Sequence, residues 1–358
     1  MLWHWLHPLA AHSGLGGACM ALAVLVALAV DRLWGEPPAR WHPVVWMGRA
    51  LGACGARIAP AAETARNLKH FWLAALAWCA LAALVVIATA ILQGVVLWFG
   101  VSAPAHPPGL DIEGVGMAGA QAVQTALVTL LTATALGLLL KPMLALAALQ
   151  NEVRAVETAL GESLQAGRAR LAWLVSREVD HLSADEVRQS AIESLAENLN
   201  DSVVAPLFWF ALAGLPGAAL YRFANTADAM WGYPGMRGGR YWQWAGKWAA
   251  RADDVLSWLP ARLTALLLAL VAGGVPLRML ACEARKTPSP NSGWPMATMA
   301  LALGVRLSKP GVYQLHAAGR APTAHDAVRA QNLVSKVAIA LILIALAAIV
   351  LIVLCMGA

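Results

Sequence analysis

Charged residues are scarce in this chain of 358 residues, of which Asp, Glu, Lys and Arg make up 13% and hydrophobic residues 59%. The mean hydropathy is +0.62. A soluble domain cannot hide that much apolar surface in one core, so the composition excludes a soluble protein. The sequence also lacks the series of alternating segments, each of about ten residues, that a closed membrane barrel needs. We therefore expect an all-α, polytopic integral membrane protein, because helices satisfy their backbone amides internally.

Cysteine is infrequent, and two familiar kinds of binding motif are missing. Neither a C-x-x-C pair nor a Cys/His metal spacing occurs, so we expect the scattered cysteines to be small buried apolar residues. They are Cys19, Cys54, Cys79, Cys282 and Cys355. No G-x-x-x-x-G-K-[ST] phosphate loop is present. The basic residues form no stripe interleaved with aromatics, which argues against nucleic-acid binding.

Four apolar runs are long enough to span a bilayer: residues 15–30, 71–99, 122–149 with a break near Lys141-Pro142, and 337–356. The first run is not read as a signal peptide, because no Lys or Arg precedes it and Arg32 follows it directly. We treat the whole chain, 1–358, as one membrane-embedded domain with a large helical portion at about 150–336.

Loop charges predict the orientation of these spans. Between the first two runs lie six basic residues: Arg32, Arg40, Arg49, Arg57, Arg66 and Lys69. The segment 101–121 has none, and it contains Asp111 and Glu113. The positive-inside rule then puts the first loop and the 150–336 portion in the cytoplasm, which implies the inner (plasma) membrane.

Two further apolar runs are broken by glycine and proline. Residues 203–220 contain Pro206, Gly214 and Pro216, and residues 259–275 end at a Gly-Gly pair. If both crossed the bilayer, the basic segment between them would face outward, against the charge rule. We expect non-crossing hairpins, either re-entrant or buried, at both places.

An acidic face marks the region after residue 190. On a helix, Glu193, Glu197, Asn200 and Asp201 fall within an arc of about 100°, and apolar residues fill the opposite side. Carboxylates four residues apart have Cβ atoms about 6 Å from each other, close enough to share a Mg²⁺ that also holds phosphate oxygens. The alternative is the solvated face of an ordinary amphipathic helix.

Two more motifs favour one metal–phosphate site: Asn225-x-x-Asp228 and the pair Asp253-Asp254. Adjacent aspartates repel each other and persist most easily beside a cation. Four basic residues are candidate phosphate ligands or, alternatively, cytoplasmic anchors: Arg222, Lys247, Arg251 and Arg262. The turn 289–295, with Asn291 and Ser292, can present amide and hydroxyl donors. The tryptophans of residues 231–258 fit a membrane-interface belt or a platform that stacks on a base or macrocycle.

Six blocks in a fixed order resemble the adenosylcobinamide-phosphate synthases of cobalamin biosynthesis. The blocks are DRLWGEPPARWHPVVWMGR, ESLAENLNDSVVAPLF, GLPGAALYRFANTADAMWGY, WAARADDVLSWLPARLTA, SPNSGWPM and LGVRLSKPGVY. The resemblance covers nearly the whole chain. It implies an ATP-dependent amide ligase that uses Mg²⁺ to join adenosylcobyric acid to (R)-1-amino-2-propanol or its O-phosphate. Other membrane enzymes of cobalamin assembly are the partners it suggests.

The resemblance also implies roles for the candidate residues. Glu193, Glu197, Asp201 and Asp228 would hold Mg²⁺; Arg251 and Arg262 would stabilise the transferring group; Asp253 or Asp254 would accept the proton of the amine. The ATP-binding residues would be Arg222, Asn225, Lys247, Asn291 and Ser292. A further segment, which precedes the ESLAENLNDSVVAPLF block, departs from the family pattern: this chain has Val175-Ser-Arg-Glu-Val179 where V-G-R-D-T is common.

Two other classes remain as alternatives. A Mg²⁺-dependent membrane prenyl- or alcohol-phosphate transferase also uses acidic pairs, although Asp253-Asp254 does not fit the separated motifs such enzymes need. A non-enzymatic membrane sensor, resembling the signalling protein of β-lactamase induction, is the second alternative. A transporter is disfavoured, because the clear spans carry almost no acidic residues.

Overall fold

The structure is a computed structural model that describes residues 15–63, 67–101, 117–175 and 178–357. Its first part comprises α2 (Leu15–Trp34), α3 (Pro43–Ile58), α4 (Leu68–Val101), α5 (Met117–Leu140), the 3-10 helix η2 (Lys141–Met143), α6 (Leu146–Glu162) and α7 (Leu164–Leu171). Four charged residues of the loops and of the 175–179 segment lie outside the described residues: Arg66, Asp111, Glu113 and Arg177.

The second part comprises α8 (Ala184–Leu199), the π-helix η3 (Asn200–Val204), α9 (Ala205–Trp231), β1 (Met236–Arg237), β2 (Arg240–Tyr241), α10 (Lys247–Val271), α11 (Leu277–Ala284), α12 (Gly293–Leu303), β3 (Leu307–Lys309), β4 (Tyr313–Leu315) and α13 (Ala324–Gly357). β1 pairs with β2, and β3 with β4, each antiparallel. Helices thus make up most of the described chain, and only four short strands accompany them, which confirms the all-α prediction.

Six helical segments of the described chain are long and apolar enough to cross a membrane. Large apolar side chains are exposed on these segments, including Leu84 and Ile91 on α4, Leu131 on α5, and Leu343 and Leu351 on α13. Contiguous exposed apolar surface on long helices is the surface that contacts lipid. The protein is therefore a polytopic membrane protein, as the composition predicts.

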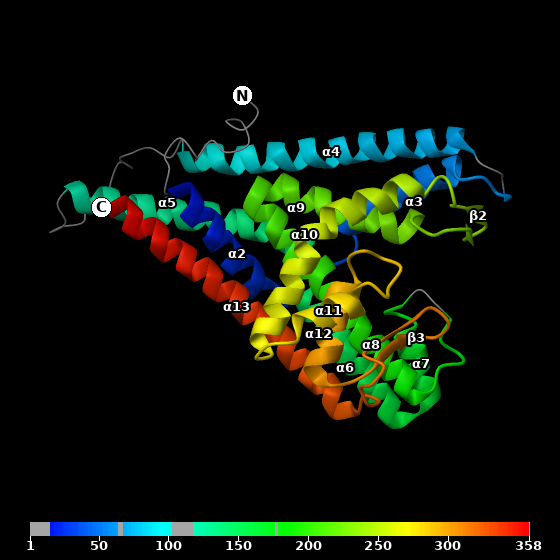
Figure 1. The fold of residues 1–358 in the computed structure, drawn as a ribbon. Helices are drawn as coiled ribbons and strands as arrows, with labels where there is room; N and C mark the ends of the chain where they lie inside the picture. Colours follow the sequence, from blue (N-terminus) through cyan, green and yellow to red (C-terminus); the bar gives the residue numbers. More distant parts are fainter. Residues whose placement is uncertain (1–14, 64–66, 102–116, 176–177, 358) are drawn as a thin grey trace.

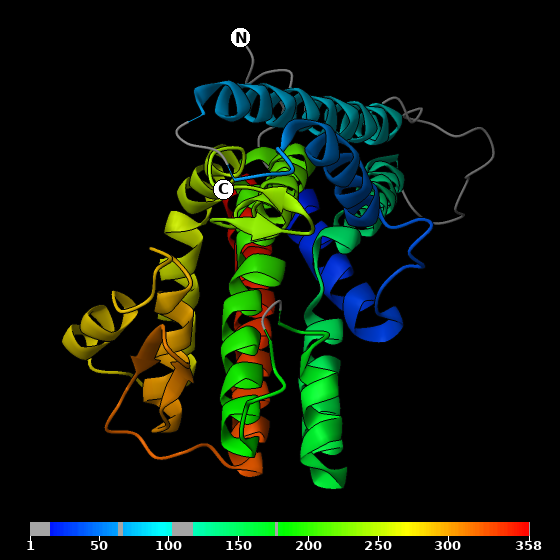
Figure 2. The same ribbon diagram turned by 90° about the vertical axis from the view of Figure 1, so that its right-hand side faces the viewer.

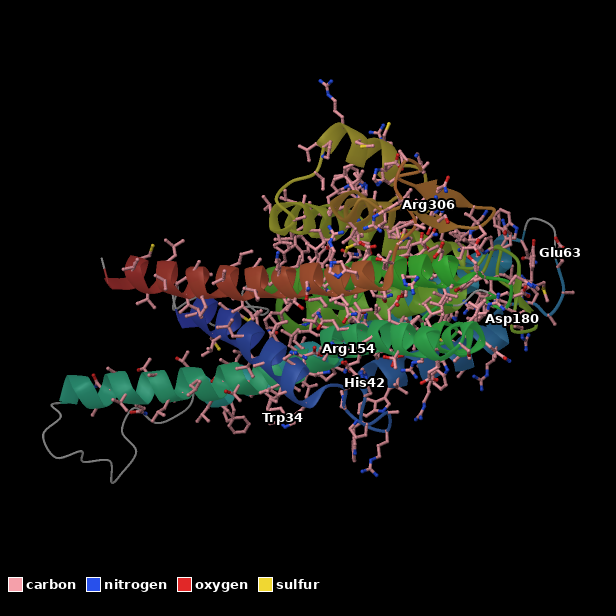
Figure 3. The ribbon with its side chains drawn as sticks, turned by 90° about the horizontal axis from the view of Figure 1, so that it is seen from below. Trp34, His42, Glu63, Arg154, Asp180 and Arg306 are labelled. Atoms are coloured by element: carbon pink, nitrogen blue, oxygen red, sulfur yellow. The ribbon has the colours of Figure 1, made fainter. Side chains whose placement is uncertain are left out.

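Polar and apolar parts of the molecule are separated in space. In Figure 1, α4 runs along one edge, and α2, α5 and the C-terminal half of α13 extend to one side. The labelled charged residues Glu63, Arg154, Asp180 and Arg306 all lie away from the free ends of α5 and α13 (Figure 3). Figure 2 shows α8 standing between α6 and α12 with α13 behind it, and α8 contacts all three.

The third apolar run breaks where the Lys141-Pro142 pair predicts. Helix α5 ends at Leu140, and a new helix, α6, begins at Leu146. A carboxylate from another helix caps α6: Asp31 Oδ2 accepts a 2.8 Å hydrogen bond from the backbone N–H of Ala147. Lys141 Nζ lies 3.2 Å from Asp31 Oδ1, and both side chains are buried. This ion pair fixes α2 to the break.

Helix α9 folds back on itself. Its backbone leaves the helical region at Gly214, with φ 66° and ψ −157°. A Cβ on Gly217 would lie 2.3 Å from the carbonyl oxygen of Trp209, eight residues earlier. A straight helix would separate those residues by about 12 Å. The first broken run therefore forms the helical hairpin that the sequence predicts.

The second broken run is not a hairpin, so that prediction is wrong. Residues 259–271 are the C-terminal half of one helix, α10, which continues through Pro260. The helix ends at Val271, before Gly273 and Gly274, both of which have positive φ. Its length and composition would allow it to cross a membrane.

The cysteine prediction holds only for Cys19, which is buried. Cys54 is half-buried, and Cys79, Cys282 and Cys355 are exposed. Cys79 and Cys355 lie on helices apolar enough to span the membrane. There an apolar thiol can face lipid instead of the protein core.

Candidate functional site

Asp201 lies in the π-helix η3, between α8 and the hairpin arm of α9. Its Oδ1 accepts hydrogen bonds from Asn200 Nδ2 at 2.8 Å and from the Tyr221 hydroxyl at 3.3 Å. Its Oδ2 accepts from Asn225 Nδ2 at 3.2 Å. Tyr221 and Asn225 come from the returning arm of the hairpin. Short π-helical segments are frequent at functional sites, and here one places Asp201 opposite that arm.

Arg222 supports the same turn from within the protein. Its Nη1 donates to the Asp201 carbonyl oxygen at 2.9 Å and to Ser202 Oγ at 3.2 Å. Its Nε is buried with no hydrogen-bond partner among the described residues. Arg222 therefore orients the backbone of η3, and the sequence-based role as a nucleotide ligand stays a prediction.

A chain of hydroxyl groups joins Asp201 to α10. The Tyr221 hydroxyl lies 3.1 Å from Ser257 Oγ, which lies 3.5 Å from Asp253 Oδ2. Thr264 Oγ1 also donates to Asn200 Oδ1 at 3.1 Å. Asp201, Asp228 and Asp254 are all close enough to repel the charge of Asp253. The acidic motifs of α8–η3, α9 and α10 thus meet at one place.

One oxygen of this cluster is buried and unsatisfied. Asp253 Oδ1 has no hydrogen-bond partner among the described residues. A buried carboxylate oxygen without a donor is costly unless the group is protonated or a cation completes its environment. Within the described chain, no three His, Cys, Asp or Glu side chains form a complete metal site. Mg²⁺ usually binds one or two carboxylates together with waters and substrate phosphates, so the cluster fits Mg²⁺ bound with a phosphate.

A polar cavity of about 400 Å³ lies between α8 and the β3–β4 hairpin. Its lining comprises Leu174, Val175, Ser190, Glu193, Ser194, Glu197, Asn198, Tyr233, Lys309 and Tyr313. Glu197 interacts electrostatically with Asp201, Glu193, Lys309 and Asp228. The cavity therefore borders the acidic cluster, which consists of Asp201, Asp228, Asp253 and Asp254.

Several cavity residues were not singled out from the sequence. Ser190, Ser194 and Asn198 share a helical face with Glu193 and Glu197, and their spacing of four residues is the signal that was available. Lys309 and Tyr313 have no local signal. They belong to the LGVRLSKPGVY block, and only the fold brings that block to α8.

Hydrogen bonds attach the β3–β4 hairpin to α8 and to α11. Ser308 Oγ donates to Gln189 Oε1 of α8 at 2.6 Å. The backbone N–H of His316 donates to Glu283 Oε2 of α11 at 2.7 Å. Burial opposes ionisation of Glu283, but hydrogen bonds from Lys286 and His316 outweigh it and hold the pKa of that carboxyl below its ordinary value. These contacts fix the strand that carries Lys309.

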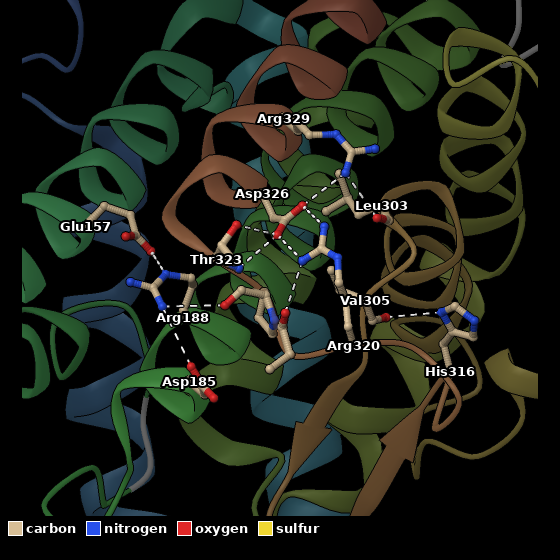
Figure 4. Close-up of polar contacts among 12 residues, drawn as sticks. Glu157, Asp185, Arg188, Leu303, Val305, His316, Arg320, Thr323, Asp326 and Arg329 are labelled. Carbon is tan, nitrogen blue, oxygen red and sulfur yellow. Dashed lines mark hydrogen bonds and ion pairs between the residues drawn. The ribbon is translucent and has the colours of Figure 1, made fainter.

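A second group of contacts holds the segment that follows the hairpin (Figure 4). Arg320 donates from Nη1 and Nη2 to the two carboxylate oxygens of Asp326, at 2.6 and 2.7 Å. Asp326 is fully buried, and it also accepts from Thr323 and Arg329. The backbone of Arg320 pairs with that of Val305, just before β3. Asp326 thereby ties the start of α13 to the base of the hairpin.

Arg262 and Asn291 join the 289–292 turn to α10. The Arg262 guanidinium stacks on Trp258 at 4.4 Å and Trp294 at 5.0 Å, and it donates to Asn291 Oδ1 at 3.0 Å. Asn291 Nδ2 in turn donates to the Asp254 carbonyl oxygen at 2.8 Å. Asn291 therefore contacts the backbone of the acidic pair directly, and Arg262 is linked to the pair through Asn291.

The remaining sequence candidates occupy the first turns of α10 and the same 289–292 turn. Lys247 stacks on the Trp244 ring at 3.6 Å, and Arg251 is exposed. The backbone N–H of Ser292 donates to Ser289 Oγ at 3.2 Å. In the divergent 175–179 block, Val175 lines the cavity, and Glu178 is exposed.

Two of the tryptophans behave as core residues. Trp231 and Trp242 are buried and stack on each other, with ring centroids 5.9 Å apart. For this pair neither a membrane-interface belt nor a ligand platform is correct. Trp258, which is 54% exposed, is placed as an interface residue would be.

The chain is similar in sequence to proteins of one known family. The CobD/Cbib protein family matches residues 24–344. A probable cobalamin biosynthesis protein CobD of Methanothermobacter thermautotrophicus is 37% identical over 298 residues, 82% of this chain and 85% of the relative. Cobalamin biosynthesis protein CobD of Chromobacterium violaceum is 38% identical over 327 residues, 88% and 92% of the two chains. That of Brucella suis is 34% identical over 309 residues, 82% and 83%.

No solved structure matches the chain. The family match includes every residue of the acidic cluster and of the polar cavity. Both the extent of that match and the identity to several relatives support one assignment. The chain belongs to the CobD/CbiB family of cobalamin biosynthesis proteins.

Proposed function

We propose that the protein is an ATP-dependent amide ligase. It joins adenosylcobyric acid to (R)-1-amino-2-propanol, free or as the O-phosphate, and so makes adenosylcobinamide or its phosphate. The observation that carries this proposal is the meeting of Asp201, Asp228 and Asp253 around a buried, unsatisfied oxygen beside a polar cavity. Such a cluster suits phosphate chemistry, and the family relation to cobalamin biosynthesis proteins supports a corrinoid substrate.

The candidate Mg²⁺ ligands are Asp201 and Asp228, joined by Asp253. Bound there, Mg²⁺ would neutralise charge on the nucleotide phosphates. Glu193 and Glu197 face the cavity instead, although Glu197 is close enough to share the ion. Asn225 and the hydroxyl of Tyr221 hold Asp201 in place by their hydrogen bonds.

The nucleotide phosphates are assigned to the first turns of α10. Lys247 and Arg251 stand four residues apart there, on the helix that carries Asp253 and Asp254. The positive end of a helix dipole and two cations favour bound phosphate. Arg262, Asn291 and Ser292 keep the adjoining turn against this helix, from which Arg262 can reach the transferring group.

The proposed reaction proceeds in two steps. A carboxylate oxygen of the corrinoid attacks the γ-phosphorus of ATP, the bond to ADP breaks, and an acyl phosphate forms. The amine nitrogen then attacks the acyl carbon, the bond to phosphate breaks, and an amide remains. Asp254 is the candidate acceptor of the proton that leaves the nitrogen, with Asp253 as the alternative. Arg251 and Arg262 would stabilise charge on the transferred phosphoryl group.

The test is a ligase assay with detergent-purified protein, adenosylcobyric acid, the amino alcohol in both forms, ATP and Mg²⁺. We expect the amide product and ADP, and a loss of at least about 100-fold in kcat for Asp201→Asn and Asp253→Asn. Asp180→Asn, at an exposed position visible in Figure 3, is the matched control. Full activity in both site variants would remove these residues from the reaction.

One feature favours the prenyl- or alcohol-phosphate transferase as a second candidate. An apolar cavity of about 690 Å³ lies among α2, α4, α9, α10 and α13, and Val204 of η3 lines it. A lipid chain could therefore end three residues from Asp201. Turnover of radiolabelled prenyl diphosphate, without any amide product, would favour that class over the ligase.

The location of the site in the cell is part of the same proposal. The basic first loop supports an active region on the cytoplasmic side of the inner membrane, where ATP is available. Other membrane enzymes of cobalamin assembly are the proposed partners. Labelling of a single cysteine at exposed Glu178, from outside intact cells, would contradict the cytoplasmic assignment.

A further inference from the structure

The polar cavity beside α8 has walls of opposite charge. Glu193 and Glu197 come from α8, and Lys309 comes from β3, which packs against α8. The Lys309 ammonium attracts Glu197 electrostatically. Tyr313, paired with Lys309 across the hairpin, lines the same wall. A ligand that carries a cation at one end and an anion at the other would satisfy both walls.

Size and charge exclude two of the three substrates of the proposed reaction from this cavity. Its volume of about 400 Å³ is near the lower end for small-molecule sites, so it cannot enclose a corrinoid macrocycle. A nucleoside triphosphate would bring several phosphate charges against two glutamates. The amino alcohol is small, and its ammonium matches the glutamates.

We propose that this cavity binds the amino alcohol as its O-phosphate, with the ammonium toward Glu193 and Glu197 and the phosphate toward Lys309. This assignment rests on the proposed ligase function. It makes Lys309 the residue that determines the preference for the phosphorylated over the free amino alcohol. Glu193 and Glu197 then orient the amine next to the acidic cluster, where the acyl phosphate forms.

The β3–β4 hairpin, which carries Lys309, is held rigidly enough to select a ligand. Ser308, adjacent to Lys309, is bonded to Gln189 of α8. His316 is bonded to Glu283 of α11, and the Asp326–Arg320 pair secures the base of the hairpin (Figure 4). The Tyr313 hydroxyl lies 3.8 Å from Met296 Sδ of α12. A cation held on a fixed strand discriminates better than one on a mobile loop, because little conformational entropy is lost on binding.

The experiment compares Lys309→Met with wild type, and Lys336→Met, at an exposed position on α13, is the control. For the O-phosphate we expect KM to rise about 30-fold in Lys309→Met, since one charge-assisted contact is lost. For the free amino alcohol, KM should change less than about 2-fold. Lys309→Arg, which keeps the charge, should retain the preference for the O-phosphate. Equal changes for both forms, or none for either, would overturn the proposal.

A binding measurement separates this proposal from the ligase function. Calorimetry with detergent-purified protein and the amino alcohol O-phosphate alone needs no turnover. We expect binding by wild type and Lys336→Met and about 30-fold weaker binding by Lys309→Met. Ligation by wild type with unaltered binding by Lys309→Met would contradict only the cavity assignment. Absence of ligation in wild type would contradict the ligase function, whatever the binding result.

Discussion

Arg222 donates a hydrogen bond of 2.9 Å to the backbone carbonyl oxygen of Asp201, which precedes it by 21 residues. In a straight helix these residues would be about 31 Å apart. The contact exists because α9 turns back at Gly214, so the acidic site depends on a glycine in an apolar part of the chain.

Replacing Gly214 with alanine tests that dependence. The backbone φ of +66° disfavours any side chain, and a Cβ would lie 2.4 Å from Gln93 Oε1 of α4. We expect the free energy of unfolding to fall by about 2 kcal/mol. Gly161→Ala is the matched control, because that helical glycine has open space around it. Thermal unfolding in detergent measures both, and equal stability of the two variants would contradict the hairpin.

The buried Asp31–Lys141 pair gives a second prediction. Asp31 also caps α6, and Lys141 Nζ lies 3.0 Å from Glu36 Oε1. Either Asp31→Asn or Lys141→Met should cost about 3 kcal/mol, because the remaining charge stays buried without its main partner. The double variant should lose clearly less than the sum of the two single losses. Additive losses in chemical unfolding would show that the two side chains do not act as a pair.

The contacts of Glu283 predict a pH dependence of stability. Its folded-state pKa is lowered from 4.5, so its contribution is complete above pH 4.5 and is lost as the pH falls below that value. The stability difference between wild type and Glu283→Gln should therefore shrink on acidification from pH 5 to 3. Glu162→Gln, at an exposed position, should show no such change. A difference that stays constant over this range would refute the assignment.

The Asp326 pair predicts an effect on both stability and substrate binding. Asp326→Asn removes the buried charged acceptor shared by Arg320, Thr323 and Arg329, and we expect a loss of about 2 kcal/mol. Asp185→Asn is the control, since Asp185 is exposed and its 3.9 Å contact with Arg188 contributes less than about 1 kcal/mol. The KM for the amino alcohol should rise in Asp326→Asn alone. Thermal melts and steady-state kinetics measure the two effects.

The membrane architecture could be predicted because long apolar runs leave few alternatives. The break at Lys141-Pro142 and the hairpin at Gly214 were also within reach, since proline and glycine interrupt helices by local chemistry. The prediction of a hairpin at 259–275 is wrong because Pro260 is tolerated inside α10. Tertiary packing against α9, α12 and α13, not local sequence, keeps that helix continuous.

The acidic residues of the site were visible from their spacing, but their grouping was not. The hydroxyl contact between Tyr221 of α9 and Ser257 of α10 joins residues that are 36 positions apart in the sequence. Lys309 reaches α8 through a hairpin fastened by Gln189 and Glu283. Such long-range contacts have no local pattern, and only the folded chain reveals them.

The most direct test of the acidic cluster is a titration with Mn²⁺ in place of Mg²⁺, followed by electron paramagnetic resonance, with ATP present. We expect wild type and Asp180→Asn to bind Mn²⁺ equally, and Asp201→Asn and Asp253→Asn to bind it at least about 10-fold more weakly. Equal Mn²⁺ affinity in all four proteins would show that carboxylates from η3 and α10 do not share a divalent ion.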